Sequence, residues 1–278
     1  MLTQLIVWLN TAAGWVAAIA LAPIAWLPGW LSATLVGVIT GIVMLWAFKH
    51  TSNQSAILRT RNQIKANLLA LSLFKDNITV SLRAQGRILI NAGRLLALSV
   101  IPMLIMFVPM CLLLGQLAVW YQARPLPVGS EAVVTAHLVM GDIDYLSGAR
   151  LETSPAFDLR AGPVRVNGKE MVCWRIQAMQ PGLHELTVTV DGQPFTKEVA
   201  IGDDYLPVSE IRPDWDWSDA LLHPRERPFA ADSAVQSIEV AYPPRASWTS
   251  GTDYWVIYWF AVSLVAAFAA RPLLKVNL

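Results

Sequence analysis

Apolar residues are gathered into three long uncharged segments of the chain. A helix that crosses a bilayer needs about 20 mostly apolar residues, because it covers a hydrocarbon core of about 30 Å at about 1.5 Å per residue. Residues 31–48, 95–121 and 254–270 approach or exceed that length and contain no charged side chain. The pattern predicts three transmembrane helices, which we name the first, second and third spans.

The N-terminal segment, residues 1–22, allows two interpretations. Its apolar residues recur near helical spacing, with Asn10 and Thr11 elsewhere on the wheel, which predicts an amphipathic helix lying in the membrane interface. The alternative is a fourth span that ends in a turn at Pro23 and Pro28. A removable signal peptide is disfavoured, because no basic segment precedes the apolar run and no clear cleavage site follows it.

Residues 49–94, between the first two spans, are predicted to form an antiparallel helical hairpin. One apolar seam keeps spacings of seven, four and three through Ile57, Ile64, Leu68 and Leu71. Residues 75–77 carry Asp and Asn, which favour a turn. A second helix then carries the apolar residues Ile78, Leu82, Leu89 and Ile90. Its exposed surface is expected to be cationic.

Residues 124–252 change to the pattern of β-strands. Leu186, Val188 and Val190 alternate with threonines, as expected in a half-buried strand, and hairpin turns are indicated by the pairs 167–168 (Asn-Gly) and 191–192 (Asp-Gly). These features predict an immunoglobulin-like β-sandwich, followed by an extended segment packed on it. Cys173 precedes a tryptophan, as in such folds, but Cys111 lies in the second span, so no disulfide is expected.

Charge is segregated by sign along the 278 residues, although the net charge is only +1. Charged residues make up 15% of the chain, against about 25% in soluble domains. Residues 49–94 hold eight basic residues and one acid, whereas residues 124–253 hold eleven basic and nineteen acidic residues. The positive-inside rule therefore places the hairpin in the cytoplasm and the β-region outside.

The tail, residues 271–278, carries Arg271 and Lys275 and returns to the cytoplasm in this scheme. Tryptophan and tyrosine prefer membrane interfaces, and they gather at the ends of the spans assigned to the outer face, for example at Trp30, Trp120 and Tyr254. We expect an integral membrane protein with its N-terminus outside, by default in a bacterial inner membrane. The fold class is a mixed membrane protein with three transmembrane helices, a helical hairpin and a β-sandwich.

The basic side chains of the hairpin have three interpretations. They can report topology alone, bind anionic lipid headgroups, or contact ribosomal RNA or a nascent chain. The candidates are Arg59, Arg61, Lys65, Lys75, Arg83 and Arg87.

Catalytic and metal-binding motifs are not found in the sequence, and we expect neither an enzyme, a metal site, a cofactor nor a DNA partner. The four histidines lack neighbouring ligands at metal spacing, and phosphate-loop, dinucleotide and nucleophile-elbow motifs are absent. Asp214, Asp216 and Asp219 lack the spacing and glycine of a calcium loop, which favours solvated acids. An extracytoplasmic hydrolase is a distant third hypothesis.

Three local sequences follow one another in a recognisable order: LWAFKHTSNQSAI, IKANLLALSLFKDN and IPMLIMFVPMCLLLGQL. With the order of spans and hairpin, they resemble the shared core of the YidC/Oxa/Alb membrane-protein insertase superfamily, whose relatives include the third subunit of the endoplasmic reticulum membrane complex. The resemblance covers roughly residues 2–121 and the third span. It implies a protein that assists insertion or assembly of membrane proteins, with nascent membrane proteins or the ribosome as partners.

The resemblance also implies a polar groove among the spans. Bacterial insertases carry an arginine in the first span, and Thr40 occupies the matching position in this chain. Groove candidates are the small or polar residues Gly37, Thr40, Gly41, Ser99, Gln116 and Ser263. The glycines have the alternative role of close helix packing, and Gln116 should bond across helices or lie near the outer headgroups. Pro102 and Pro109 are expected to kink the second span.

The uncharged first span supports a rival hypothesis. In this view the chain is a structural or docking subunit of a larger membrane complex, and its β-domain binds an extracytoplasmic partner.

Overall fold

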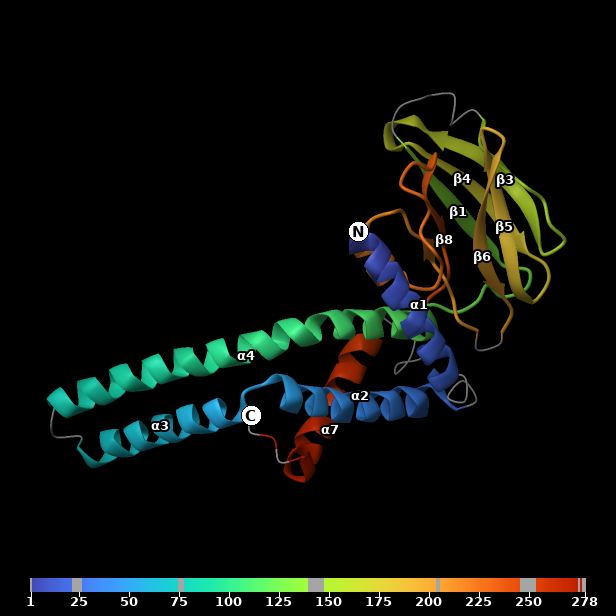
Figure 1. The fold of residues 1–278 in the computed structure, drawn as a ribbon. Helices are drawn as coiled ribbons and strands as arrows, with labels where there is room; N and C mark the ends of the chain where they lie inside the picture. The colour runs from blue at the N-terminus through green and yellow to red at the C-terminus, as the bar shows by residue number, and fades with distance from the viewer. Residues whose placement is uncertain are drawn as a thin grey trace. The chain divides into compact units, whose positions relative to one another are not determined.

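The computed structural model describes residues 2–21, 27–74, 78–139, 148–203, 206–245, 254–274 and 276. The predicted hairpin turn at residues 75–77, which includes Lys75, lies outside the described residues, as do Pro23 and Lys275. The chain divides into two compact units (Figure 1). Unit 1 comprises Met1–Ala33 and Cys111–Val256, and unit 2 comprises Thr34–Met110 and Ile257–Leu278.

Four of the described helices are long and apolar enough to cross a membrane. They are α1 (Leu2–Leu21), α2 (Gly29–Thr51), α4 (Ile78–Tyr121) and α7 (Trp255–Leu274). The expectation of several long apolar helices beside a separate β-region is thereby confirmed. By length and composition α1 qualifies as well as the three predicted spans, so both interpretations of the N-terminal segment stand.

The second half of the predicted hairpin and the second span form one helix, α4, of 44 residues. Our sequence prediction placed the boundary between hairpin and span near residue 95, but no proline occurs between Ile90 and Leu96, and Asn91 and Gly93, which are residue types that can cap a helix, both lie within α4. Pro102 and Pro109 also lie inside the continuous helix. At about 1.5 Å per residue α4 is about 66 Å long, roughly twice the thickness of the hydrocarbon core.

The other hairpin helix, α3 (Gln54–Leu73), begins at a side-chain cap. Asn53 Oδ1 accepts a hydrogen bond from the backbone N–H of Ala56 at 3.0 Å, which satisfies one free N–H of the first turn. At the other end, Ser81 Oγ of α4 donates to the carbonyl of Phe74 at 3.1 Å. This bond ties together the two helices on either side of residues 75–77.

The β-domain of unit 1 contains two antiparallel sheets (Figure 1). One has the order β3-β4-β1-β8-β7 and the other the order β2-β5-β6. The strands are β1 (Glu131–Leu138), β2 (Arg150–Leu151), β3 (Phe157–Val166), β4 (Met171–Ala178), β5 (Gly182–Val190), β6 (Gln193–Ile201), β7 (Ile211–Arg212) and β8 (Val235–Val240), and a short 3-10 helix, η2 (Asn167–Lys169), follows β3.

Both predicted hairpins are confirmed. β5 and β6 pair in register around Asp191 and Gly192, which have φ angles of 49° and 76°. Two positive φ angles are what a two-residue hairpin turn needs, and glycine and aspartate adopt them at low cost. β3 and β4 pair on either side of residues 167–170.

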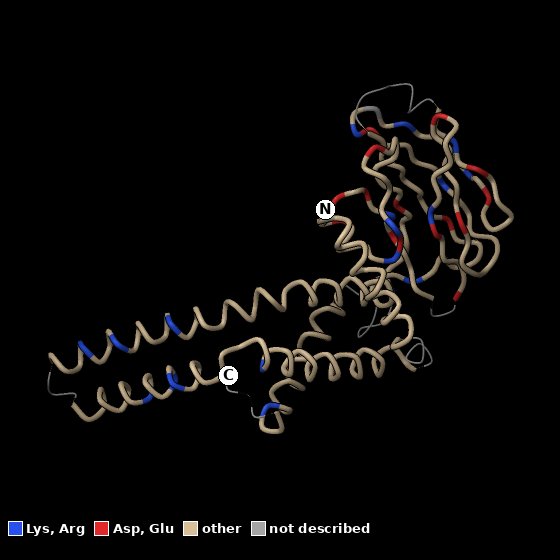
Figure 2. The backbone as a smooth tube through the Cα atoms, in the orientation of Figure 1, with Lys and Arg blue, Asp and Glu red and all other residues tan. Residues whose placement is uncertain are grey.

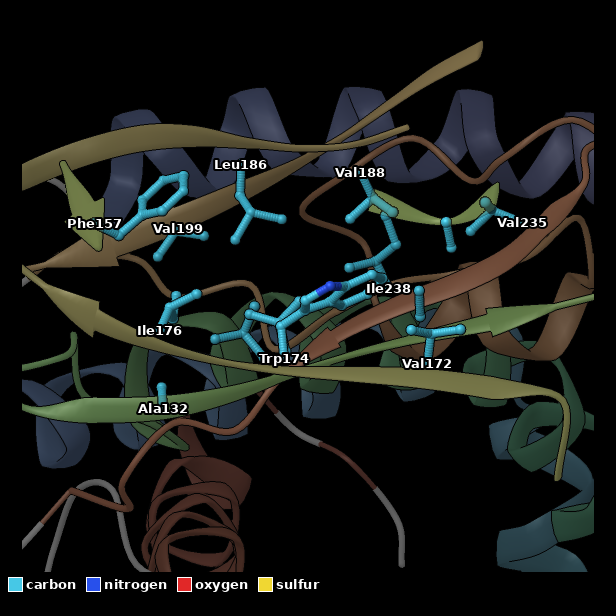
Figure 3. Packing of buried hydrophobic residues seen from close by; sticks show 14 of the residues in the cluster. Ala132, Phe157, Val172, Trp174, Ile176, Leu186, Val188, Val199, Val235 and Ile238 are labelled. Carbon is cyan, nitrogen blue, oxygen red and sulfur yellow. The ribbon is translucent and has the colours of Figure 1, made fainter. Parts of the chain in front are cut away.

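The core of the β-domain is one cluster of buried side chains from both sheets (Figure 3). Leu186, Val188 and Val190 are fully buried, as their alternation predicts, and Trp174 of β4 is also buried. Cys173, next to it, is a free thiol, and so is Cys111.

The segment after β6 is less extended than predicted, because it contains a short helix, α6 (Trp217–Leu222). Asp216 caps α6, since its Oδ2 accepts from the backbone N–H of Ser218 at 3.0 Å, and Asp214 Oδ1 accepts from the N–H of Asp216 at 3.2 Å. Two of the three clustered aspartates therefore hold local backbone. Ala220 and Leu221 of α6 pack with Ile6 of α1 in a buried cluster.

Candidate functional site

The two glycines of the first span are close-packing positions between α2 and α7 in unit 2. A Cβ atom added to Gly41 would lie 2.1 Å from the carbonyl oxygen of Ser263, and one added to Gly37 would lie 2.9 Å from Cγ1 of Val262. Small residues allow helix backbones to approach in this way. A cross-helix contact that the sequence did not indicate lies nearby, between Thr34 Oγ1 and the Tyr258 hydroxyl at 2.6 Å.

The hydroxyl groups among the groove candidates bond to their own helices. Thr40 Oγ1 donates to the carbonyl of Val36 at 2.7 Å. Ser99 Oγ donates to Leu95 at 3.0 Å, and Ser263 Oγ donates to Phe260 at 2.8 Å. Each donor is thus already satisfied within one helix.

Gln116, the remaining groove candidate, belongs to unit 1, near the end of α4. It lines a cavity of about 340 Å³ together with Asn10, Gly14 and Trp15 of α1 and the segment that follows α6. Both amide side chains are buried, and Asn10 Nδ2 donates to the carbonyl of Ala220. Asn10 Oδ1 and Gln116 Nε2 have no hydrogen-bond partner among the described residues.

The basic residues of the hairpin are distributed along α3 and the first part of α4 (Figure 2). Arg59, Lys65, Arg83 and Arg87 are exposed, and Arg61 is half-buried. The one acidic residue within 49–94 is Asp76, which lies outside the described residues. Within the described part of the hairpin, every charged residue is therefore basic.

Large apolar side chains share this surface. Ile57 of the predicted seam is buried and Ile64 and Leu71 are half-buried, but Leu68 is exposed. In α4 the predicted apolar residues Ile78, Leu82, Leu89 and Ile90 are each between 63% and 75% exposed. The hairpin thus presents apolar and basic side chains together, and within the seam predicted for residues 57–71 Leu68 is the exposed member.

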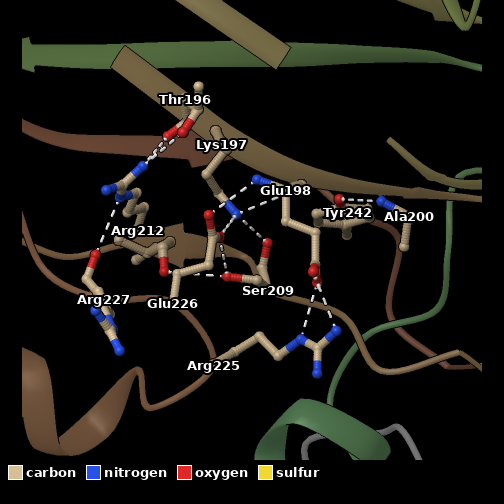
Figure 4. Close-up of polar contacts among 11 residues, drawn as sticks. Thr196, Lys197, Glu198, Ala200, Ser209, Arg212, Arg225, Glu226, Arg227 and Tyr242 are labelled. Atoms are coloured by element: carbon tan, nitrogen blue, oxygen red, sulfur yellow. Dashed lines mark hydrogen bonds and ion pairs between the residues drawn. The ribbon is translucent and has the colours of Figure 1, made fainter. Parts of the chain in front are cut away.

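A buried ionic network lies in the β-domain (Figure 4). The ammonium group of Lys197 in β6 is fully buried, pairs with Oε1 of Glu226, and donates to the carbonyls of Ser209 and Glu198 at 2.7 and 3.0 Å. Burial lowers the pKa of Lys197, and the charge of Glu226 offsets part of this effect. The sequence contained an indication of this buried lysine, because Lys197 shares the inward-facing alternation of β6 with Phe195 and Val199.

Other members of the network bond to the backbone of β6. Oε2 of Glu226 accepts from the N–H of Glu198 at 2.9 Å, and Nη1 of Arg212 donates to the carbonyl of Thr196 at 2.6 Å. The Tyr242 hydroxyl accepts from the N–H of Ala200 at 3.0 Å. Burial raises the pKa of Tyr242. These groups fix the strand, and their chemistry is structural.

No cluster of three or more His, Cys, Asp or Glu side chains that could hold a metal ion occurs in the described part of the chain. Two arrangements of described residues are suited to contact another molecule, namely the hairpin of unit 2, which carries apolar and basic side chains, and the amide-lined cavity of unit 1. No protein family, curated protein or solved structure matches the chain.

Proposed function

We propose that the chain is an integral membrane protein of the insertase type, which receives hydrophobic segments of client proteins at its hairpin and assists their insertion or assembly. The resemblance of the spans and hairpin to the insertase superfamily supports this proposal. In this function the chain is not an enzyme.

The distribution of charge supports a specific topology. The basic hairpin and the tail lie in the cytoplasm, and the acidic β-domain, an immunoglobulin-like sandwich, lies outside, in a bacterial inner membrane. α2, α4 and α7 form three spans, and α1 lies in the outer interface, or crosses as a fourth span.

The surface of the hairpin carries the proposal. Burial of a leucine or isoleucine side chain contributes about 1.5–3 kcal/mol, so Leu82, Leu89 and Ile90 together offer several kcal/mol to a hydrophobic client segment. Arg83 and Arg87, which are exposed on the same helix, attract the phosphates of lipid headgroups or of ribosomal RNA. Both chemistries meet where a nascent segment reaches the membrane.

Reconstitution into liposomes with a short-tailed membrane-protein substrate tests the proposal. We expect insertion above that of empty liposomes, and a clear loss in the double variant Leu82→Ser, Leu89→Ser. Leu183→Ser, which makes the same change at an exposed position of β5, is the matched control and should insert normally. Insertion no greater than that of empty liposomes would reject the proposal.

A structural or docking subunit is the second candidate, and the packing of the spans favours it. Gly37 and Gly41 are occupied by contacts with α7, and the hydroxyl of Thr40 bonds within its own helix. Native purification separates the two candidates. A large partner present in stoichiometric amount supports docking, whereas transient crosslinks from the hairpin to nascent chains support the insertase.

A further inference from the structure

The cavity of unit 1 has rigid walls on three sides. α1 forms one wall, the end of α4 forms the second, and residues 224–228 form the third. Asn10 ties α1 to α6 through its bond to Ala220, and Gly115 of α4 lies so close to α6 that an added Cβ would be 2.9 Å from the carbonyl oxygen of Leu221. These contacts hold the cavity open at about 340 Å³.

Two buried amide groups give the cavity its chemistry. Asn10 is 5% exposed and Gln116 is 9% exposed. Oδ1 of Asn10 is an acceptor and Nε2 of Gln116 is a donor, and neither has a partner among the described residues. An unpaired buried polar group is costly, so the cavity is suited to a molecule that offers both a donor and an acceptor.

The remaining lining indicates an amphipathic molecule. Val7, Trp15 and Val119 supply apolar surface, and Arg227 also lines the cavity. The guanidinium of Arg227 forms no ion pair within the described part of the chain, whereas that of Arg225 pairs with Glu198 at 2.8 Å. Arg227 is therefore available for an anion such as a phosphate.

The surroundings of α1 supply such a molecule. Its outward side chains, including Leu5, Trp8 and Ile19, are exposed and apolar, and the helix is long and apolar enough to lie in or across a bilayer. Lipid therefore surrounds the cavity wall. This observation favours a lipid over a peptide as the occupant.

We propose that this cavity binds one phospholipid whose headgroup carries hydrogen-bond donors, such as phosphatidylethanolamine or phosphatidylglycerol. The headgroup donor bonds to Asn10 Oδ1, an ester or phosphate oxygen accepts from Gln116 Nε2, and Arg227 pairs with the phosphate. Phosphatidylcholine has no headgroup donor and leaves Asn10 unpaired. The site is separate from the hairpin and does not depend on the insertase proposal.

Native mass spectrometry of the full chain in detergent, titrated with dioleoyl lipids, tests the headgroup preference. We expect one bound phosphatidylethanolamine or phosphatidylglycerol, with an affinity about tenfold higher than that of phosphatidylcholine, as one hydrogen bond would give. Equal binding of phosphatidylcholine, no bound lipid, or a peptide in place of lipid would each overturn the proposal.

Variants of Gln116 test the role of its side-chain amide in lipid binding. Gln116→Met keeps the length of the side chain but removes the donor, and should weaken binding of phosphatidylethanolamine about tenfold. Gln85→Met makes the same change at an exposed position of the same helix and should bind as the unmodified chain does. Equal affinities of the two variants would contradict the assigned role of Gln116. Should Gln116→Met fail to fold, the headgroup comparison on the unmodified chain decides.

Discussion

Removal of the carboxylate of Glu226 should destabilise the β-domain strongly. That carboxylate is 12% exposed and accepts hydrogen bonds from the ammonium of Lys197, the hydroxyl of Ser209 and the N–H of Glu198. Glu226→Gln removes the carboxylate that pairs directly with the fully buried Lys197, and its amide –NH2 must face a hydrogen-bond donor on one side, either the N–H of Glu198 or the ammonium and hydroxyl groups of Lys197 and Ser209. Breaking a buried pair costs about 3–5 kcal/mol, a large part of the roughly 5–15 kcal/mol that holds a domain folded.

Pulse proteolysis of the full chain in urea measures this loss through cleavage of the β-domain. Glu198→Gln is the matched control, because Glu198 and Arg225 form a half-exposed pair whose removal should cost about 1 kcal/mol or less. Equal losses in the two variants would refute the reasoning.

The same network predicts a pH dependence. Burial holds the pKa of Lys197 below its ordinary value of 10.5, so between the two values the unfolded chain binds more protons than the folded one. Stability from this group therefore rises as the pH rises from the folded pKa of Lys197 towards 10.5. Loss of the Glu226 charge lowers the folded pKa of Lys197 further, so the deficit of Glu226→Gln should shrink as the pH rises towards the folded pKa of the unmodified chain. A deficit that is constant up to pH 10 would contradict the assignment.

Three further outcomes are expected. Gly41→Ala forces α2 away from α7 and should cost about 1–3 kcal/mol of stability in thermal unfolding of the detergent-solubilised chain. Gly93→Ala, whose added Cβ meets no atom within 4 Å, is the control and should be neutral or stabilising. The reverse order of stabilities would count against close packing of α2 and α7. Gly162 has a φ of +119°, and an added Cβ would lie 2.9 Å from a carbonyl oxygen of β4. Gly162→Ala should therefore cost the β-domain about 2 kcal/mol or more of stability, measured by pulse proteolysis. An unchanged stability would show that β3 adjusts. Burial, followed by the charge of Glu239, raises the pKa of Glu210 above its usual 4.5. The stability of the β-domain should therefore fall as the pH rises through the folded pKa of Glu210, and it should fall less steeply in Glu239→Gln. Identical pH profiles of the two proteins would refute the coupling.

Local sequence patterns predicted the elements whose conformation is set by residues close to one another in the chain. The Asp-Gly turn at residues 191–192 and the alternation through Leu186 and Val188 located β5 and β6 because turn geometry and strand burial depend on neighbouring residues. Long apolar runs located the long apolar helices for the same reason. The boundary that the change of polarity suggested near residue 95 falls inside the continuous helix α4, because a change of polarity along a chain does not by itself end a helix.

Long-range contacts could not be predicted from the sequence. Lys197 and Glu226 are 29 residues apart, and Asn10 and Ala220 are 210 residues apart, so no local pattern connects them. The apolar residues of the hairpin showed helical spacing, but spacing alone did not say that Leu82 and Leu89 would be exposed. Periodicity identifies a face of a helix and leaves its partner undetermined.

The buried network around Lys197 also affects how the domain meets other copies of itself. β6 ends its sheet, and an edge strand normally offers free N–H and carbonyl groups to which another chain can add. Side chains of Arg212, Glu226 and Tyr242 already occupy such groups at Thr196, Glu198 and Ala200. The strand thus has little left to template a cross-chain sheet, which protects the β-domain from edge-to-edge association.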